Sequence, residues 1–483
     1  MTKYKKHFKI GIPSVLVQSV EEILKTNPPS FKYEISGFYG IIRDITTSMG
    51  NCKDAMVPLC SKILQPKYGA NYRLMLDYLV QNKIISENHQ YLDGKCRKFG
   101  VTVKSGQLKN LTVIDIGLDT KYGKYVKKRH NKEQVKAKSK DYYIRQLRNE
   151  FYNLKFDSTS ALHDLNLRKD LLTNEQFIAI SDDIICLHHQ NQNRRYFNRN
   201  TTNQRIDNNI TSLKSFYKKY IISTTNLFQL DLNNSQPVLF NVVLDLIIKL
   251  INEEINIKDI TLTLCYGNKR LKQLITQCYQ GIKDNAKLVG FLQNEILKYK
   301  HFTSNGIWYN HLADLYNDFY LTEYFDRQAA KSLWMALAYS GDNSQNYKKS
   351  KEAFKQNYPG ISKIFQIFKK TNYKDLSIIL QNIESKIFID DISKALIHAG
   401  IVPLTVHDAI IVNENQLIQS REIMYSVLEK HLGFRPIIET EKLKDLEFKG
   451  KINSIDVASK IEELDVLRSY QHLIEKLNKK KKN

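Results

Sequence analysis

The sequence is poor in cysteine and has no paired-cysteine motif. Its 483 residues include only six cysteines, and none of them belongs to a CxxC pair. These are Cys52, Cys60, Cys96, Cys186, Cys265 and Cys278. Together with the lack of a signal-peptide pattern, this usage predicts a protein of the reducing cytoplasm. Cys186, His188 and His189 lie close together, but a fourth ligand at the usual spacing is missing. We therefore expect no zinc there.

Long apolar runs and internal repeats are also lacking. The most apolar stretch, residues 238–251, is interrupted by Asn241, Asp245 and Lys249. No segment therefore approaches the length of a membrane span, and we expect no contact with a membrane. A chain of this length can still form roughly two to four domains, each with a substantial core.

Acidic residues are in deficit relative to basic ones. Lysine and arginine total 73 against 50 for aspartate and glutamate, which gives a net charge of +23, and the sequence pI is about 9.4. Such a balance favours a polyphosphate partner, and the 11% of aromatic residues could stack on bases. Ribosomal and membrane-surface proteins are also basic, so charge alone does not choose between these classes.

Residues 327–339 predict a helix with a cationic stripe. Arg327, Lys331, Met335 and Tyr339 are each four positions apart, so in a helix their side chains project along one slowly turning line. Two cations followed by an aromatic hydroxyl suit a nucleoside triphosphate, with its phosphates at the cations and its sugar or base at the tyrosine. The opposite face, which carries Trp334, is apolar enough to pack on a core. A merely solvated cationic face is the alternative.

Two acidic segments flank this helix in the sequence. Asp231 ends an apolar stretch and is followed by a polar turn and an apolar run with Pro237 near its start, which predicts a strand, a turn and a helix. His407 and Asp408 interrupt a second apolar stretch, as in a tight hairpin with the acid at its tip. Two carboxylates at strand ends can share a pair of Mg²⁺ ions. Alternatively, Asp231 caps a helix and Asp408 makes a turn.

Taken in chain order, these three segments resemble motifs A, B and C of the family A polymerase superfamily. That superfamily joins bacterial DNA polymerase I and its relatives to the single-subunit RNA polymerases of phages and mitochondria. The resemblance assigns Asp231 and Asp408 as catalytic, metal-binding residues. It assigns Arg327, Lys331 and Tyr339 to the triphosphate and sugar.

Further segments extend the resemblance to roughly residues 200–440. Residues 354–359 resemble the fingers segment after motif B, and residues 380–385, with Gln381, resemble the helix that precedes motif C. The resemblance implies nucleic-acid contacts for Gln381 and for His407 beside the motif C acid. Arg205, in the Arg- and Asn-rich residues 190–215, is a candidate for primer or template contact. A solvated linker is the alternative interpretation of that segment.

Departures from the family pattern bear on the choice of sugar. Gln236 stands where DNA polymerases of the family usually carry a glutamate that blocks the ribose 2′-hydroxyl and RNA polymerases carry glycine, so it could act as a steric gate. Met335 matches the phage RNA polymerases instead, and Ala409 lacks the glutamate of DNA polymerase I. Asp408 follows Tyr339 by only 69 positions (408 − 339), as in compact family A-like proteins of mobile elements. We favour deoxyribonucleotides.

The remaining segments predict the domain plan. Residues 1–50 read as helix and loop. Residues 53–105 read as two helices and a β-wing with an Asp93–Gly94 turn. This segment could be a winged-helix-like module that binds duplex nucleic acid or a plain packing unit. Basic residues crowd between 121 and 148, on a thumb-like arm or a solvated helix. The only other acids that stand out, Asp115 and the Asp182–Asp183 pair, are isolated and do not form an acidic set for a proofreading exonuclease.

We therefore expect an α+β right-hand polymerase with a largely helical N-terminal region. Its parts are an N-terminal region (1–105), a thumb-like basic helical region (106–220), a palm (221–263 and 376–450), fingers (264–375) and a basic C-terminal tail (451–483). The expected activity is template-directed DNA synthesis from nucleoside triphosphates on a nucleic-acid template and primer, with two Mg²⁺ ions, or Mn²⁺ in their place.

Other functions stay open at this stage. One alternative is a single-subunit RNA polymerase, a primase or a template-independent polymerase. A second is a non-catalytic nucleic-acid-binding protein of replication or antiviral defence. The biological role could be DNA replication, repair or defence.

Overall fold

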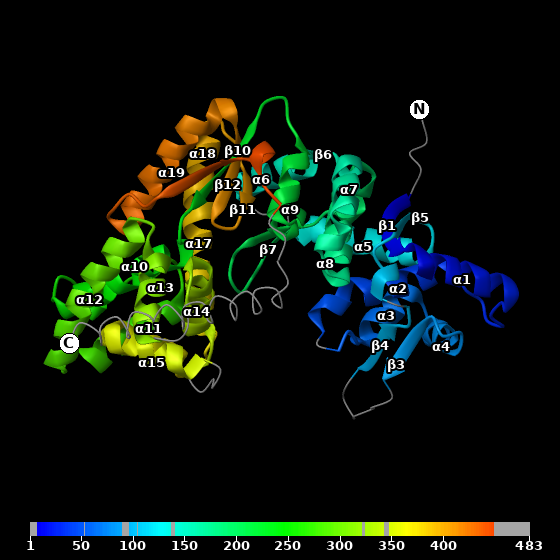
Figure 1. Cartoon of the computed structure of the whole chain (residues 1–483). Coiled ribbons are helices and arrows are strands. Elements are labelled where there is room, and N and C mark those ends of the chain that lie inside the picture. The colour runs from blue at the N-terminus through cyan, green and yellow to red at the C-terminus, as the bar shows by residue number, and fades with distance from the viewer. Residues whose placement is uncertain are drawn as a thin grey trace, which may run out of the picture.

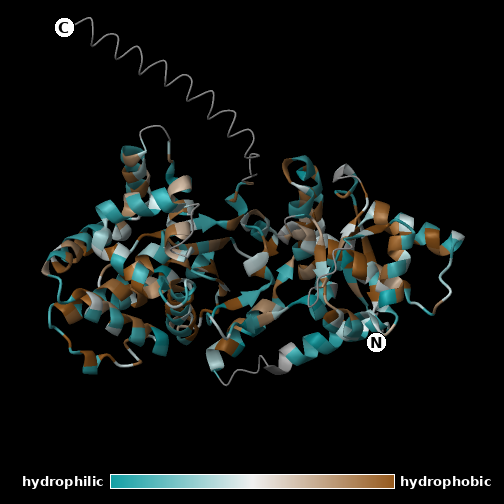
Figure 2. Cartoon of the chain, turned by 90° about the horizontal axis from the view of Figure 1, so that it is seen from below, coloured by the Kyte–Doolittle hydropathy of each residue, from teal (hydrophilic) through white to brown (hydrophobic). Residues whose placement is uncertain are grey.

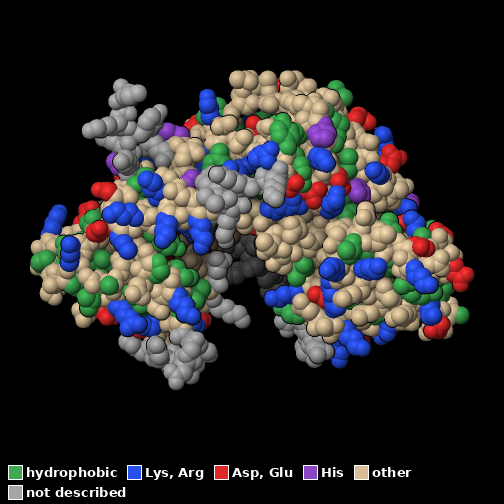
Figure 3. Space-filling view, turned by 180° about the vertical axis from the view of Figure 1, so that it is seen from behind, with side chains coloured by type: hydrophobic (Ala, Val, Ile, Leu, Met, Phe, Trp, Pro, Cys, Tyr) green, Lys and Arg blue, Asp and Glu red, His purple; other side chains and the backbone are tan. Residues whose placement is uncertain are grey.

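The computed structural model describes residues 7–52, 54–88, 96–103, 105–136, 141–320, 324–341 and 347–448. The expected Asp93–Gly94 turn and the expected basic tail, residues 451–483, lie outside the described residues. The described chain mixes helices and sheets in two lobes that meet at a central sheet (Figure 1). Seen from behind, the surface is hollowed between the lobes, and lysine and arginine side chains lie on both (Figure 3).

The N-terminal lobe contains two small sheets and four helices. Its elements are β1 (His7–Pro13), α1 (Ser14–Thr26), α2 (Ile35–Ser48), β2 (Val57–Leu59), α3 (Ser61–Tyr68), α4 (Tyr72–Gln81), β3 (Ile85–Asn88), β4 (Arg97–Val101) and β5 (Leu111–Gly117). The strands β2, β4 and β3 form one antiparallel sheet in that order, beside α3 and α4. The expected two helices followed by a wing are thus present, with β2 as an additional strand.

Strand β1 corrects the expectation of helix and loop for residues 1–50. Phe8, Ile10 and Ile12 alternate along it and are fully buried, which is the period-two pattern of a half-buried strand. Its antiparallel partner β5 lies about 100 residues later, with Ile10 opposite Ile114. The expected domain boundary at residue 105 therefore falls between two segments that share one core.

The segment from 121 to 222 is mostly helical and completes the same core. It contains α5 (Lys121–Lys136), α6 (Tyr142–Asn153), β6 (Lys155–Phe156), α7 (Ser158–Leu167), α8 (Asn174–Leu187), β7 (Phe197–Arg199), β8 (Ile206–Asn208), α9 (Asn209–Ser212), the 3-10 helix η5 (Ser215–Tyr220) and β9 (Ile221–Ile222). Asp182 on α8 forms ion pairs with Arg43 of α2 and with Arg194, which joins these helices.

Residues 190–215 are not a solvated linker. Arg195 is 1% exposed, and its guanidinium donates hydrogen bonds to four backbone carbonyls, of Phe151, Tyr152, Leu154 and Leu187. The strands β7 and β8 in this segment pair with each other. Arg195 therefore stabilises the fold of this segment through buried hydrogen bonds, in addition to contributing positive charge.

A four-stranded antiparallel sheet forms the centre of the molecule. Its strands are β10 (Leu227–Leu232), β11 (Leu404–Val406), β12 (Ala409–Asn413) and β13 (Ile438–Lys442), in the order β11-β12-β10-β13. The elements beside it are α10 (Ser235–Ile251), α17 (Asp375–Ser385), the π-helix η8 (Lys386–Ile392), α18 (Ser393–His398) and α19 (Leu417–Leu432). The predicted strand, turn and helix around Asp231, and the predicted hairpin at His407–Asp408, are confirmed.

The second lobe (left in Figure 1) contains α10 and six further helices among the described residues. These six are α11 (Lys269–Ile282), α12 (Ala286–Ser304), α13 (Trp308–Phe319), α14 (Arg327–Tyr339), α15 (Lys348–Asn357) and α16 (Pro359–Lys369). An aromatic cluster that includes Trp308 and Trp334 fills their core. Gly360 lets α16 approach α12 closely, because a Cβ at that position would lie 2.9 Å from the Leu292 Cα. The predicted helix at 327–339 is confirmed as α14.

The helices are amphipathic rather than uniformly apolar. Figure 2 shows hydrophilic and hydrophobic residues along most of them, as expected for helices that pack one face on a core. Within the described part of the chain, no helix combines the length and the apolar character needed to cross a bilayer.

Candidate active site

The central sheet brings the two predicted acids together. Asp231 lies opposite Ala409 in the β10–β12 pairing, so it is next to Asp408, the turn residue that immediately precedes β12. The backbone N–H of Leu232 donates to the Asp408 carbonyl oxygen at 3.3 Å. His407 adopts a left-handed backbone conformation (φ = 53°), which allows the two-residue turn that places Asp408 at the hairpin tip.

The two acids form a region of strong negative potential. Burial, followed by the charges of Asp408 and Glu439, raises the pKa of Asp231 to about 8, while Lys218 and Lys331 oppose the shift. Among the described residues, none donates a hydrogen bond to either carboxylate. Crowded carboxylates without protein donors are suited to bind a cation.

Lys218 is a member of this site that the sequence did not indicate. It lies on η5, is buried, and donates to the Gln229 side chain at 3.3 Å. Burial lowers its pKa, whereas the charges of Asp231, Asp408 and Glu441 act in the opposite direction. Lys218 comes close to the two acids only through the tertiary fold, and no local sequence motif distinguishes this lysine.

Helix α14 presents the predicted cationic stripe. Asp326 caps its N-terminus by accepting the Ala329 N–H at 2.7 Å. Arg327, Lys331 and Met335 are exposed on one face, and the residues that pack on the core are Ala330, Trp334, Leu337 and Ala338. The solvated-face alternative does not account for two further contacts of this stripe.

The N-terminal half of the stripe lies close to the acids. Lys331 contributes to the electrostatic field at Asp231, and Arg327 donates to Asn234, just beyond β10, at 3.4 Å. Both cations lie over the ring of buried Tyr309, at 5.7 Å for Arg327 and 6.0 Å for Lys331. Contact with this ring holds the Arg327 and Lys331 side chains on the side of α14 that faces the two carboxylates.

A hydrogen-bonded chain occupies the other end of the stripe. The Tyr339 hydroxyl donates to Gln236 Oε1 at 2.8 Å, and Gln236 Nε2 donates to Glu384 Oε2 at 2.5 Å. Arg205 Nη2 donates to the same Glu384 oxygen at 2.6 Å. Glu384 is 1% exposed, and burial, followed by the charge of Asp408, raises its pKa to about 7 while Arg205 opposes the shift.

Two of the three predicted nucleic-acid contacts, Arg205 and Gln381, have protein partners in this structure, whereas the buried Nδ1 of His407 has none among the described residues. Arg205 binds Glu384, and Gln381 accepts a 3.0 Å hydrogen bond from Asn203. Burial lowers the pKa of His407, and the charge of Arg205 lowers it further. These residues border the site. Glu384 lies one helical turn beyond Gln381, and that spacing was the signal that could have identified it.

The donor set fits a metal that also takes ligands from a substrate. Within the described residues, no group of three or more histidine, cysteine, aspartate or glutamate side chains is arranged as a metal site. Mg²⁺ is commonly bound through one or two carboxylates together with substrate phosphates and water, rather than by an all-protein cage. Asp231 and Asp408 provide such a pair.

Comparisons with known proteins give little further information. No family model matches the chain, and no curated protein matches it. Among solved structures, it is similar to the POL domain of Pol1 from M. smegmatis in complex with DNA primer-template and dNTP, at 10% identity and a TM-score of 0.24. The match covers 60% of this chain and 55% of that one, so the chain spans about half of its length. At this level of similarity, only the residue geometry of the site bears on function.

Proposed function

We propose that this protein is a nucleotidyltransferase, a template-directed DNA polymerase with a two-metal site at Asp231 and Asp408. One observation carries the proposal: Asp231 on β10 is paired with the residue that follows Asp408 in the hairpin, and the charges of both Asp408 and Lys331 act on the Asp231 carboxylate. This combination suits a triphosphate whose phosphates are held by cations at one end and by carboxylate-bound metal at the other.

The proposed architecture is a right hand. The β10–β13 sheet and its helices, residues 221–263 and 376–450, form the palm. The helices α11 to α16, residues 264–375, form the fingers, and residues 106–220 form the thumb-like region. The hollow between the lobes (Figure 3) would receive the nucleic acid. The basic excess of the chain supports a polyanionic partner.

The side chains divide the chemical work. Arg327 and Lys331 hold the incoming phosphates and stabilise the negative charge that grows there during transfer. Asp231 and Asp408 would hold two Mg²⁺ ions, or Mn²⁺, which would lower the pKa of the attacking 3′-hydroxyl and neutralise phosphoryl charge. The positive charge of Lys218 offsets part of the negative charge of the two acids.

Sugar selection is assigned to Gln236. Tyr339 and Glu384 fix this side chain by hydrogen bonds on both sides of its amide, and a fixed bulky group excludes a 2′-hydroxyl more sharply than a mobile one. The protein is accordingly proposed to use deoxyribonucleotides. Met335, exposed in the middle of the stripe, favours the second candidate function, RNA synthesis or priming with ribonucleotides.

A nucleotide-incorporation assay tests the proposal. Purified protein is incubated with labelled dNTPs or rNTPs, with Mg²⁺ or Mn²⁺, on primed and unprimed DNA and RNA templates. The Asp231→Asn variant serves as the inactive control. Template-dependent dNTP incorporation supports the proposal, preference for rNTPs supports the second candidate, and no incorporation on any template would leave a non-catalytic nucleic-acid-binding protein.

A further inference from the structure

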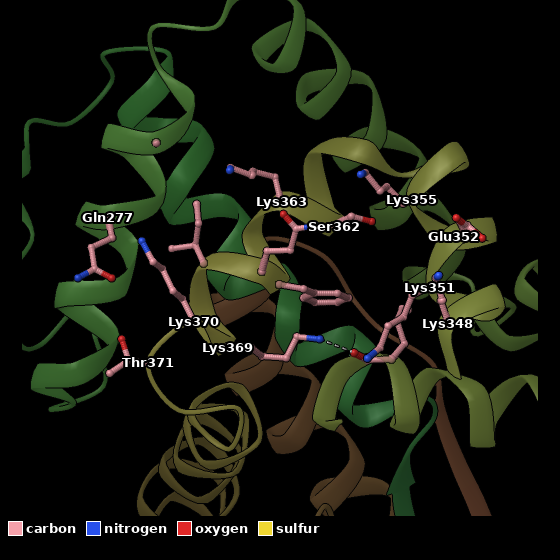
Figure 4. Close-up of a pocket in the computed structure, with 15 residues that line it drawn as sticks. Gln277, Lys348, Lys351, Glu352, Lys355, Ser362, Lys363, Lys369, Lys370 and Thr371 are labelled. Carbon is pink, nitrogen blue, oxygen red and sulfur yellow. Dashed lines mark hydrogen bonds between the residues drawn. The ribbon is translucent and has the colours of Figure 1, made fainter. Parts of the chain in front are cut away.

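A lysine-lined pocket lies in the helical lobe, apart from the two acids. It is a cavity of about 980 Å³ between α11, α15, α16 and the buried side of α14. The lysines that line it are Lys348, Lys351, Lys355, Lys363, Lys369 and Lys370. Glu352 is the only acid among its described lining residues. Figure 4 shows Lys363 and Lys370 on the side of Gln277, and Lys348, Lys351 and Lys355 on the side of Glu352.

Helix geometry explains why these charges converge. Lys348, Lys351 and Lys355 follow steps of three and four residues on α15, so they share one face. Lys363 and Lys370 are seven positions apart, which places them on one side of α16 and its continuation. Like charges at such spacings repel one another. A bound anion would remove that repulsion.

Two of the six lysines already form hydrogen bonds within the protein. Lys369 is 7% exposed and donates to the carbonyl oxygens of Leu337 at 3.0 Å and Ser340 at 3.4 Å. Lys351 donates to the Gly341 carbonyl oxygen at 2.5 Å. These bonds close the C-terminal end of α14, so Lys351 and Lys369 form one wall of the pocket.

The other four lysines are available to a ligand. Within the described part of the chain, Lys348, Lys355, Lys363 and Lys370 form no ion pair with an acid. Ser362 also lines the pocket, is 8% exposed, and its Oγ has no hydrogen-bond partner among the described residues. A buried hydroxyl without a partner costs free energy, and a phosphoryl oxygen would accept its hydrogen bond.

The lining favours phosphate groups over nucleobases. Phe365 is the only aromatic among the described lining residues, and it is 3% exposed. No surface for base stacking is therefore available, although single-strand binding usually depends on one. Lysine recognises phosphate as a point charge without demanding a fixed orientation.

We propose that this pocket binds a compact polyphosphate anion, a chain of three or more linked phosphoryl groups. The four available lysines neutralise its charge, and Ser362 donates to one of its oxygens. The site is distinct from the triphosphate contacts proposed for Arg327 and Lys331, which lie on the exposed face of α14, whereas the pocket meets that helix through buried Leu337. It does not depend on catalysis.

Calorimetric titration with inorganic tripolyphosphate, at low salt and without divalent cations, tests this site. The full-length protein carrying Arg327→Ala and Lys331→Ala is titrated first, because these changes remove the other proposed phosphate contacts. Adding Lys363→Gln and Lys370→Gln should weaken binding by about tenfold or more, since two unit charges facing the anion are lost. Adding Lys287→Gln and Lys298→Gln, two exposed lysines of α12, is the matched control and should change affinity by less than about twofold.

Three results would overturn the proposal. They are binding that disappears with Arg327→Ala and Lys331→Ala alone, equal losses in the pocket and control variants, and unchanged affinity in the pocket variant. A titration with oligodeoxythymidylate addresses a nucleic-acid strand as the occupant. Weaker oligonucleotide binding with unchanged tripolyphosphate binding would also reject the polyphosphate site. Because only binding is measured, an inactive enzyme would still give a positive result.

Discussion

The Tyr339 hydroxyl donates a 2.8 Å hydrogen bond to the Gln236 side chain, across 103 positions of sequence. Tyr339 ends the helix proposed to hold the triphosphate, and Gln236 begins the helix that follows Asp231. The bond therefore connects the sugar end of the proposed nucleotide site to the strand that carries the first acid. Glu384 holds the other end of the same amide.

Removing the Gln236 side chain should relax the selection of deoxyribonucleotides over ribonucleotides. Gln236→Gly removes the side chain that would press on a ribose 2′-hydroxyl, and we expect ribonucleotide use relative to deoxyribonucleotide use to rise about tenfold, or about 1.4 kcal/mol of lost discrimination. Side-by-side kcat/KM values for dNTP and rNTP measure it. Tyr339→Phe, which removes only the hydroxyl, should produce a smaller change in the same direction. A wild type that already prefers rNTPs would reject the gate.

Either acid should be indispensable for synthesis. Asp231→Asn or Asp408→Asn removes one charged metal ligand while keeping the side-chain volume, and we expect activity to fall on the order of a thousandfold. Binding to primed DNA, measured by fluorescence anisotropy, should stay within about threefold of wild type, since the affinity comes mainly from lysine and arginine. More than about a tenth of wild-type activity in either variant would contradict the two-metal assignment.

The cations of α14 should matter through the incoming nucleotide. Lys331→Ala removes a charge directed at the phosphates, and we expect kcat/KM to fall by about a hundredfold, with a smaller loss for Arg327→Ala. Gln328→Ala is the matched control, because Gln328 is an exposed neighbour on the same helix. If all three variants show wild-type KM and kcat, the stripe is a solvated face.

The neighbouring acids Asp182 and Asp183 should respond oppositely to the same substitution. Burial alone would raise the pKa of Asp182, but Arg194 and Arg43 lower it well below its usual value. Asp182→Asn leaves the largely buried Arg194 without its carboxylate and Arg43 with only Asp44, at 3.6 Å, and we expect a loss of about 3 kcal/mol in the free energy of unfolding. Urea denaturation at pH 7 measures this.

Asp183→Asn should be neutral or stabilising at the same pH. Burial, followed by the charge of Asp182, raises the pKa of Asp183 from its usual 3.8 to about 6. The folded state thus binds more protons between these values, so its stability falls as pH rises through that window. The variant should gain up to about 2 kcal/mol over wild type at pH 8 and nothing near pH 3. A stability difference that does not change with pH would refute this.

Local patterns predicted the elements of the site but not its full composition. The four-residue spacing from Arg327 to Tyr339 predicted α14, and the apolar segments around Asp231 and Asp408 predicted the strand and hairpin, because these patterns are set by near neighbours in sequence. Lys218 joins the site only through packing between distant segments, whereas the position of Glu384 one helical turn after Gln381 was a local signal that went unused. The pairing of β1 with β5 was missed for the same reason as Lys218, since the partner of a seven-residue strand lies about 100 positions away.

The order of strands in the central sheet also sets the timing of folding. Strand β10 lies between β12 and β13, and the end of β13 is synthesised 210 residues after the end of β10 (442 − 232). At about 5–20 residues per second, the ribosome needs roughly 10–40 s to supply both neighbours. During that interval at least one edge of β10 lacks its partner strand, and open strand edges are prone to pair with other chains. The nascent chain therefore gains its proposed catalytic centre late, and a chaperone that shields β10 should raise the yield of folded protein.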